Sequence, residues 1–284
     1  MATWDEHRPS LTGEALHLLR DLFQQRSGFF LRDDLKFVAE RRLANRLEML
    51  GLRDFLSYHR YLRFDPRGSE ELEIAIDMLI PHETYFFREP AQLACFVKEI
   101  VPMLAAANAS SRALRLWSAG CASGEEPYTL AMLTLDAPGL EGFEIDVLGT
   151  DLSRKALATA RHAEYGPAGL RVTTPAQRAR FFEPADQGRL RVLPRYRAPV
   201  RFGQLNLLDA AGAALLSSLD VIFCRNVLIY FDVETRRRVV DIFFNRLRPG
   251  GLLLLGHSEN LLSAGTAFEL LQLDGDLVYR RPAR

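Results

Sequence analysis

Up to about Pro81 the chain shows the hydrophobic spacing of helices and lacks convincing strands. Apolar residues recur three and four positions apart, which is the pattern of a helix with one buried face. Gly51 ends one such stretch and Asp65-Pro66 ends another, because proline disfavours helical backbone at the residue before it. We predict a small bundle of four helices: one capped by Ser10, one over about 34–50, one over about 54–64, and one from Ser69 to Pro81.

After about Ala113 short apolar runs alternate with helical stretches, which is the pattern of a parallel sheet. We therefore predict an α/β fold with a doubly wound sheet. Residues 164–199 are too long for a simple connection, so we expect an inserted subdomain there. The predicted strands cover 114–118, 144–149, 200–205, 220–224 and 252–256, with a final pair near 268–273 and 276–281, and the helices between them cover 125–135, 153–163 and 232–247.

Composition narrows the class of protein. The 284 residues are 48% hydrophobic, which excludes intrinsic disorder, and 36 Lys+Arg against 36 Asp+Glu make general polyanion binding improbable. No apolar run approaches the ~18–20 residues of a membrane helix, and the start, MATWDEHRPS, lacks the apolar core of a secretory signal. We expect a cytoplasmic protein without membrane insertion. Three scattered cysteines and no H-x-x-x-H pair argue against a metal site.

A run of small residues between a predicted strand and a predicted helix is the first candidate site. It contains Gly120 and Gly124, and Glu125 and Glu126 follow directly. Small residues let the backbone approach a ligand closely, and the helix N-terminus supplies N–H donors. No lysine follows, and the two acids would repel a pyrophosphate, so the pattern favours a cationic ligand. The alternative is a turn with a structural role only.

Asp151 ends the next predicted strand, where nucleoside-binding sheets carry an acid that accepts hydrogen bonds from the ribose. The alternative is a cap for the helix that begins near Ser153. Together with the glycine turn, the nucleoside interpretation is preferred. Because phosphate is disfavoured, S-adenosylmethionine suits the site better than NAD.

Two further polar sites follow the third and fourth core strands. Asn206 can read an adenine edge while Leu207 packs on the ring, although a strand-end Asn can also be structural. Arg225 and Asn226 interrupt an otherwise apolar run, so they must be matched by partners or be functional.

Four motifs stand in order along the chain: HETYFFRE (82–89), SGEEPY (123–128), FCRNV (223–227) and GHSEN (256–260). Together they resemble the chemotaxis receptor methyltransferases, the CheR family. The resemblance implies methylation of glutamate side chains on the cytoplasmic helices of chemoreceptors, with S-adenosylmethionine as cofactor. It also implies a helical domain over 1–80 for receptor recognition, a linker over 81–100, and a catalytic domain over 101–284 with a β insertion at about 180–204.

The resemblance also implies roles for single residues. Thr84 and Arg88 would reach the cofactor, and Glu126, with Glu125, would hold its ammonium group. Arg88 and Tyr230 would lie nearest the transferred methyl. The family usually has Asn where this chain has His82, which can still donate a hydrogen bond. The alternative for Arg88 is a salt bridge to Glu83 or Glu89. The remaining cofactor-site residues would be Gly120, Asp151, Asn206, Leu207, Arg225 and Asn226.

Charge distribution suggests where a receptor binds. Arg42 and Arg46 share one face of the second helix, and family members use this basic helix to bind the receptor; the alternative is internal pairing. Residues 161–204 hold nine arginines against three acids. Some family members use this region to capture a pentapeptide tether at the receptor's C-terminus. The turn between Phe182 and Gly188 is short here, so we expect that this protein works without the tether. We expect a monomer that binds no nucleic acid. The competing functions are a nucleic-acid methyltransferase and a catalytically silent cofactor-binding regulator.

Overall fold

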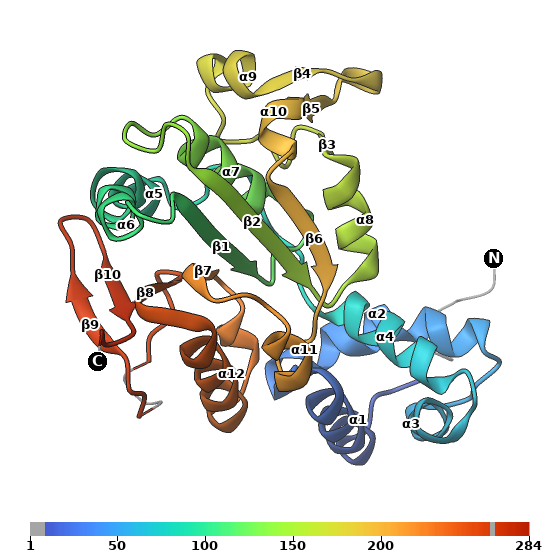
Figure 1. The fold of residues 1–284 in the computed structure, drawn as a ribbon. Helices are drawn as coiled ribbons and strands as arrows, with labels where there is room; N and C mark the ends of the chain where they lie inside the picture. Colours follow the sequence, from blue (N-terminus) through green and yellow to red (C-terminus); the bar gives the residue numbers. More distant parts are fainter. Residues whose placement is uncertain (1–8, 262–264, 284) are drawn as a thin grey trace. The chain divides into compact units, whose positions relative to one another are not determined.

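The structure, a computed structural model, describes residues 9–261 and 265–283 (Figure 1). Most of the N-terminal stretch used to argue against a secretory signal lies outside the described residues. Contacts divide the chain into two units, which are described separately. The helical unit comprises Met1–Pro81 and Tyr230–Thr235, and the α/β unit comprises His82–Ile229 and Arg236–Arg284.

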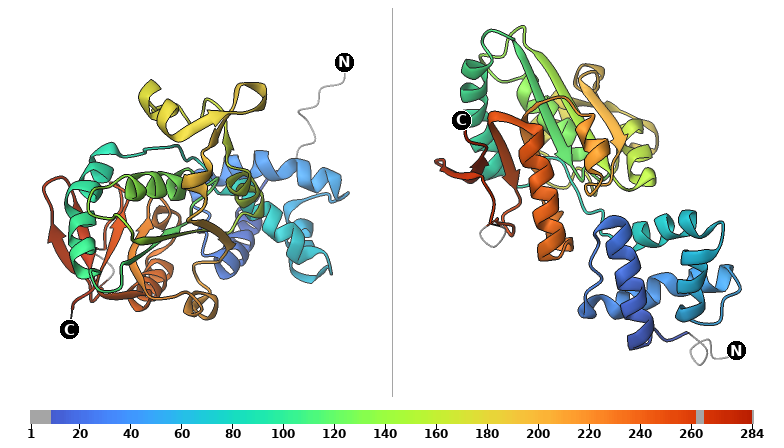
Figure 2. Two further views of the ribbon diagram at one scale, coloured as in Figure 1. Left: turned by 45° about the horizontal axis from the view of Figure 1, so that its top comes forward. Right: turned by 60° about the horizontal axis from the view of Figure 1, so that its bottom comes forward.

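The helical unit contains the four predicted helices, seen at the blue end of the chain in the right-hand view of Figure 2. Thr12 caps the first helix by accepting a hydrogen bond from the Ala15 N–H at 3.3 Å, so the prediction of Ser10 as the cap was wrong. Leu19, Phe23 and Tyr58 are fully buried in this unit. Its elements are α1 (Gly13–Ser27), the 3₁₀ turn η1 (Asp33–Leu35), α2 (Lys36–Met49), α3 (Phe55–Phe64) and α4 (Gly68–Leu79).

A segment distant in sequence joins the helical unit. Phe231 forms an isolated antiparallel bridge with Phe29, and the Phe30 N–H donates to the Tyr230 carbonyl at 2.9 Å. The Gln24 amide donates to the Asp232 carboxylate at 2.6 Å. Residues 230–235, which we expected within the catalytic domain, therefore group with the helices.

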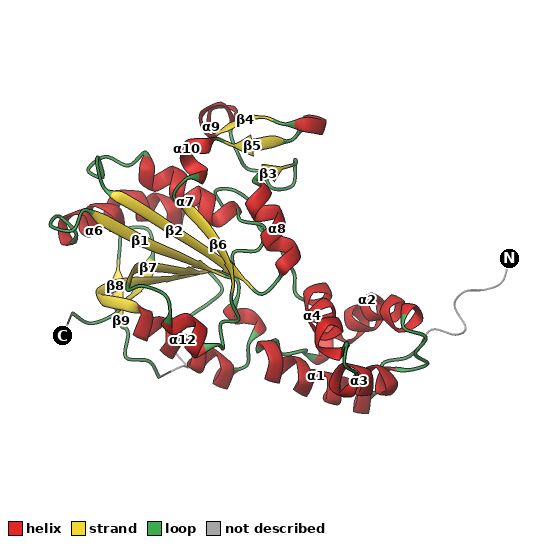
Figure 3. Cartoon of the chain, turned by 45° about the vertical axis from the view of Figure 1, so that its right-hand side comes forward, coloured by secondary structure: helices red, strands yellow, loops and turns green. Residues whose placement is uncertain are grey.

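The α/β unit is built on a seven-stranded sheet in the order β6-β2-β1-β7-β8-β10-β9 (Figure 3). The strands from β6 to β8 in this order are parallel to one another, and β10 is antiparallel to β8 and β9. The predicted doubly wound α/β fold is confirmed. The strands are β1 (Ala113–Ala119), β2 (Glu144–Asp151), β6 (Val200–Gln204), β7 (Leu219–Cys224), β8 (Leu247–Leu255), β9 (Glu269–Gln272) and β10 (Leu277–Arg280).

Helices cover both faces of this sheet. Leu116 belongs to one core cluster with Phe96 and Leu130, whereas the next residue, Trp117, packs edge-on against Phe243 at 5.3 Å. Successive strand residues point to opposite faces, so these contacts identify the two layers. The helical elements are α5 (Pro90–Cys95), the π-helical η2 (Phe96–Ile100), α6 (Val101–Ala107), α7 (Glu125–Leu135), α8 (Arg154–His162), α11 (Ala210–Ala214), the 3₁₀ turn η4 (Leu228–Tyr230) and α12 (Val233–Arg246).

The continuous stretch Pro90–Ala107 is long and apolar enough, by length and composition alone, to cross a membrane. Lys98 and Glu99 interrupt its apolar run, and it was not predicted from the sequence. Phe96, Ile100 and Val101 from this stretch are fully buried in the core that includes Leu114. Its buried apolar residues therefore pack in the core of the α/β unit.

The insertion forms a separate antiparallel sheet in the order β3-β5-β4. It begins earlier than the expected residue 180, and β6, which we included in it, belongs to the main sheet. Its elements are β3 (Glu164–Tyr165), α9 (Pro175–Phe181), β4 (Phe182–Pro184), η3 (Asp186–Gly188), β5 (Leu190–Val192) and α10 (Pro194–Arg197).

Candidate cofactor and active site

The candidate site residues follow the carboxyl ends of the parallel strands. The chain moves from β1 outward to β2 and β6 on one side, and from β7 to β8 on the other, so the strand order reverses between β1 and β7. Open α/β sheets bind ligands in the crevice at such a point. The residues at these strand ends are Gly120, Asp151, Asn206, Arg225 and Glu259.

The glycine turn after β1 is closely packed. Gly120 and Gly124 have φ of 82° and 92°, which L side chains rarely adopt. A Cβ at Gly120 would lie 2.5 Å from Val227 Cγ2, and one at Gly124 would lie 2.7 Å from the Ala160 Cβ. The backbone of the turn therefore approaches the β7 loop and α8 as only glycine allows.

Glu126, in the first turn of α7, belongs to a triad of charges with the buried Arg225 and the half-buried Glu89. Ser118 Oγ donates to Glu126 Oε1 at 2.6 Å, and Arg225 donates to Glu126 Oε2 at 3.1 Å. The same guanidinium donates to Glu89 Oε2 at 3.0 Å and to the Arg88 carbonyl at 2.7 Å. The Arg225 side chain is only 3% exposed.

This triad carries an unbalanced charge. Two half-buried carboxylates, Glu89 and Glu126, face one buried guanidinium, which leaves a net charge of about −1. An uncompensated charge that is partly removed from water is unfavourable, so the arrangement favours a cationic ligand group. The ammonium group expected of the cofactor's methionine fits this requirement.

The side chains of the adjacent residues Glu125 and Glu126 contact different parts of the α/β unit. Glu125 accepts a hydrogen bond from Ser123 Oγ at 2.7 Å, and its Oε1 lies 2.9 Å from where a Cβ at Gly169 would be. Burial raises the pKa of the Glu125 carboxyl above its ordinary value. Glu125 therefore faces the insertion, whereas Glu126 faces Arg225.

Asp151 connects the two turns at the ends of β1 and β2. One carboxylate oxygen accepts from the Ala122 N–H and the other from the Ser153 N–H, each at 2.8 Å. The helix cap is Ser153, whose Oγ accepts from the Ala156 N–H at 3.0 Å. The alternative role of Asp151 as the cap of α8 is therefore excluded.

Asn206 forms a local turn after β6. Its Oδ1 accepts from the Leu208 N–H at 3.0 Å, and its carbonyl accepts from the Asp209 N–H at 2.8 Å. Leu207 is buried. The alternative, a structural role for this strand-end Asn, therefore accounts for the contact between its side chain and the Leu208 N–H.

Asn226 adopts a left-handed backbone, with φ of 59°. Its Oδ1 is buried and accepts no hydrogen bond from the described residues. A buried amide oxygen without a donor is costly unless a water or a ligand supplies one. The structure therefore offers an acceptor at the carboxyl end of β7.

The linker that carries Arg88 is held in a strained conformation. Phe87 and Glu89, on either side of Arg88, have φ of 58° and 57°. The Phe86 N–H donates to the Gly169 carbonyl at 2.9 Å, and the Phe87 N–H donates to Thr129 Oγ1 at 3.3 Å. Left-handed conformations of non-glycine residues cost of order 1 kcal/mol or more each and concentrate at functional sites.

The carboxylates expected to pair with Arg88 are bound by other arginines. Glu83 pairs with Arg171 at 2.7 Å, and Glu89 pairs with Arg225. Arg88 instead donates to the Glu83 carbonyl at 2.9 Å and lies 5.6 Å from the centroid of the Tyr85 ring. The alternative of an Arg88 salt bridge to either acid is not what the structure has. His82 and Thr84 are half-buried.

Tyr230 and the basic helix belong to the helical unit. The Tyr230 ring lies 6.4 Å from that of Phe29. Arg46 forms a bidentate pair with Glu71 at 2.9 and 2.5 Å, and Arg42 donates to the Met78 carbonyl at 2.7 Å. Both arginines named as receptor-binding residues thus have internal partners.

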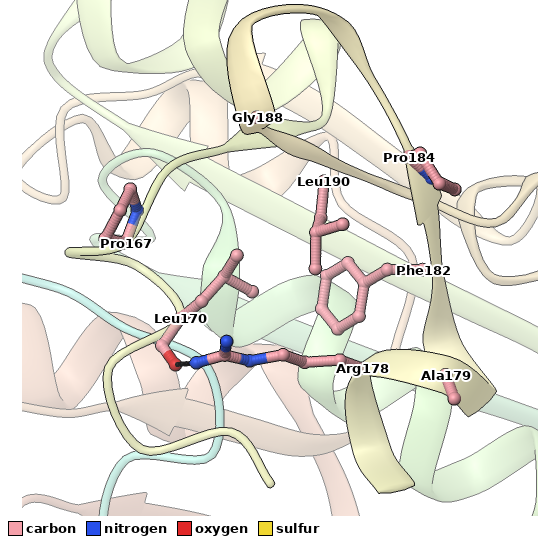
Figure 4. Close-up of a pocket in the computed structure, with 8 residues that line it drawn as sticks. All are labelled: Pro167, Leu170, Arg178, Ala179, Phe182, Pro184, Gly188 and Leu190. Carbon is pink, nitrogen blue, oxygen red and sulfur yellow. Dashed lines mark hydrogen bonds between the residues drawn. The ribbon is translucent and has the colours of Figure 1, made fainter. Parts of the chain in front are cut away.

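Acids outside the insertion neutralise part of the positive charge that its sequence carries. Acids outside it pair with its arginines: Asp136 with Arg180 at 2.7 Å and Arg195 at 3.2 Å, and Glu83 with Arg171. The insertion also holds a mostly apolar pocket of about 430 Å³. Figure 4 shows its lining, in which Arg178 donates to the Leu170 carbonyl; the distance is 3.0 Å.

Glu89, which contacts Arg225, and Ser118, which contacts Glu126, were not among the predicted site residues. Glu89 directly follows Arg88 and Ser118 lies two residues before Gly120, so closeness to predicted residues was the available signal. Within residues 9–261 and 265–283, no group of three or more His, Cys, Asp or Glu side chains is arranged to hold a metal ion.

Comparisons with known proteins agree with this geometry. Residues 82–276 match the family described as "CheR methyltransferase, SAM binding domain", and residues 14–80 match "CheR methyltransferase, all-alpha domain". The chain is 34% identical over 264 residues to chemotaxis protein methyltransferase 2 of Vibrio cholerae, covering 93% of this chain and 91% of that protein. It is 38% identical over 266 residues to the chemotaxis protein methyltransferase of Klebsiella aerogenes, covering 92% and 87%. The chain belongs to the CheR family and is an S-adenosylmethionine-dependent methyltransferase of chemotaxis.

Proposed function

We propose that this methyltransferase modifies glutamate side chains of chemoreceptor cytoplasmic domains, giving γ-glutamyl methyl esters and S-adenosylhomocysteine. The observation that carries the proposal is the placement of Arg88. Arg88 lies between two residues with left-handed backbone. The neighbouring acids are bound by other arginines, Glu83 by Arg171 and Glu89 by Arg225. An arginine in this setting is suited to receive a carboxylate from another molecule.

The cofactor contacts follow from the chemistry of each side chain. Glu126, in the triad with surplus negative charge, would hold the ammonium group, and the buried Asn226 Oδ1 would accept a hydrogen bond from the cofactor. Asp151 would accept from the ribose through the second lone pairs of oxygens that already accept N–H groups. Asn206 and Leu207 would meet the adenine. Secondary contacts would come from His82, Thr84, Gly120 and Glu125.

The reaction needs no general base. A receptor glutamate has a pKa near ~4.3, so it is already ionised at neutral pH. When bound, the cofactor supplies an electrophilic methyl group on a sulfonium. Arg88 would orient the incoming carboxylate so that its oxygen forms the new C–O bond as the C–S bond breaks, and the gain comes from holding the reactants aligned. Tyr230 is proposed as a hydrogen-bonding positioning residue.

Receptor recognition would use the exposed face of α2. Because Arg42 and Arg46 have internal partners, we assign them the task of holding α2 against α4. Arg41 and Phe37, exposed on the same helix, would make the contact, and Phe37 is 78% exposed.

The protein would act as a cytoplasmic monomer. With only residues 185–189 between β4 and β5, it would work without a receptor pentapeptide tether.

The test uses cofactor with a labelled methyl group and purified receptor cytoplasmic fragments. Mild alkali should release volatile labelled methanol from methyl esters, and Arg88→Ala is the matched inactive control. An alkali-stable label on receptor or nucleic acid would contradict the proposal. Cofactor binding without any transfer would indicate a silent regulator. For the tether, calorimetric binding of a receptor tail peptide at micromolar affinity would overturn the proposal of independence.

A further inference from the structure

Glu259 makes an unusual set of contacts for a side chain outside the predicted site. It follows β8, and its carboxylate reaches across to the turn after β7. Oε2 accepts from the N–H groups of Asn226 at 2.6 Å and Gly256 at 2.9 Å. Oε1 accepts from the N–H groups of Val227 at 3.0 Å and Ile229 at 3.2 Å. One carboxylate therefore binds four backbone donors from two separate loops.

The Glu259 side chain is half-buried. Burial raises the pKa of the Glu259 carboxyl above its ordinary value, and the N–H donors act in the opposite direction. Hydrogen bonds from several N–H groups to an ionised carboxylate are stronger than neutral ones, and more so where water is excluded. The carboxylate is thus the acceptor around which the β7 turn is organised.

The turn that Glu259 holds is one that would not form readily by itself. Asn226 has φ of 59°, and its side-chain Oδ1 is buried without a donor from the described residues. The next residue, Val227, packs so closely on Gly120 that a Cβ there would lie 2.5 Å from its Cγ2. The turn therefore links the β1 and β8 ends of the site, and its conformation decides where Asn226 points.

We propose that Glu259 is a positioning residue for cofactor binding: it holds the turn at 226–229 in the conformation that presents the Asn226 amide to the cofactor. The inference rests on the proposed assignment of Asn226 to the cofactor site. Glu259 does not touch the cofactor in this scheme. It acts through backbone N–H groups, which is why its effect is expected in affinity rather than only in stability.

The test compares Glu259→Gln with Asp220→Asn, a matched change of a buried carboxylate. Asp220, near the amino end of β7, accepts from the Arg115 N–H at 2.7 Å and pairs with Arg248 at 2.7 Å. Dissociation constants for S-adenosylhomocysteine are measured by calorimetry well below each melting temperature. Glu259→Gln should weaken binding by about tenfold or more, because the amide cannot accept all four N–H groups, and Asp220→Asn by less than about twofold.

Asn226→Ala separates failure of this inference from failure of the site assignment. If Asn226→Ala weakens binding by about tenfold and Glu259→Gln does not, Glu259 has no positioning role and the inference is overturned alone. If neither variant changes affinity, the assignment of Asn226 and the inference fall together. Equal losses of affinity in Glu259→Gln and Asp220→Asn would also overturn it, since a general loss of stability would then explain both.

Discussion

Two arginines paired with carboxylates, one in each unit, show how charge balance separates a structural ion pair from a ligand site. Arg46 in the helical unit meets a single carboxylate, Glu71, which also accepts from the Tyr58 hydroxyl at 2.8 Å. Arg225 in the α/β unit meets two, Glu126 and Glu89. The first cluster is neutral and complete, whereas the second keeps an excess negative charge that a cationic cofactor can satisfy.

The sharpest way to break this comparison is to remove each arginine. Arg225→Met should lower the free energy of unfolding by about 3–5 kcal/mol, because Glu89 and Glu126 lose their shared partner and repel each other. It should also weaken cofactor binding by about a hundredfold or more, because Glu126 is no longer held in the orientation that the ammonium group needs. Arg46→Met should cost about 2 kcal/mol and leave the cofactor affinity unchanged. Urea unfolding and calorimetry measure both. If Arg46→Met weakened cofactor binding as much, the distinction would be wrong.

Arg88 is a third case, since its neighbouring acids are bound elsewhere. Arg88→Ala should lower kcat/KM for receptor methylation by about a hundredfold, because a bidentate contact to the incoming carboxylate is lost. Initial rates with receptor fragments measure the effect. Arg171→Ala removes the other arginine stacked on Tyr85 and also releases Glu83, so it should lower kcat/KM by a smaller factor, about tenfold. Equal losses would show that Arg88 only supports the linker.

The contribution of the excess negative charge to cofactor binding can be tested by changing each carboxylate of the triad in turn. Glu126→Gln should weaken cofactor binding by about thirtyfold, since a contact between carboxylate and ammonium is lost. Glu89→Gln removes the same charge without that contact, so its smaller loss of affinity, about threefold, measures the contribution of the excess charge alone. Calorimetry with S-adenosylmethionine distinguishes them. Similar losses in both variants would mean that total charge, rather than contact with Glu126, attracts the cofactor.

The smallest expected effect is a pH dependence from Glu125. Because burial raises its pKa in the folded protein above the ordinary value of 4.5, the protonated form is favoured on folding. That contribution is fully present below the unfolded pKa and is lost as pH rises through the folded pKa. Relative to wild type, Glu125→Gln should therefore gain stability between pH 4.5 and 7.5, by about 1 kcal/mol or less. Urea unfolding at both pH values measures it, and a relative loss of stability would contradict the sign.

Local patterns were sufficient for most elements of the fold. The apolar runs at 114–118 and 220–224 became β1 and β7, and the helix predicted over 125–135 is α7. These predictions worked because a strand buried on both faces is a short continuous apolar run, and β7 is buried throughout, while α7 follows directly on the glycine turn that begins it. The insertion was harder to delimit, because β3 has only two residues and leaves no periodic signal.

Site residues were identified better than their partners. Glu126 and Arg225 were both singled out, yet nothing in the sequence says that they bind each other across 99 positions, or that Glu89 completes the triad. Arg42 and Arg46 looked alike on a helix face, but Glu71 and the Met78 carbonyl, which engage them, come from another helix. Partners distant in sequence are set by packing, which spacing does not encode.

The sequence by itself determined the class of fold, the order of the strand ends, and which residue types stand at those ends, because these depend on local periodicity and on the rule that parallel strands end at one edge of a sheet. Tertiary structure alone decided which charges are balanced and which are not. It placed one acid against Arg46 and two against Arg225, and it brought the Glu259 carboxylate to the turn at Asn226. The physical reason is that the free energy of a buried charge depends on every neighbour within a few ångströms, and folding chooses those neighbours from the whole chain.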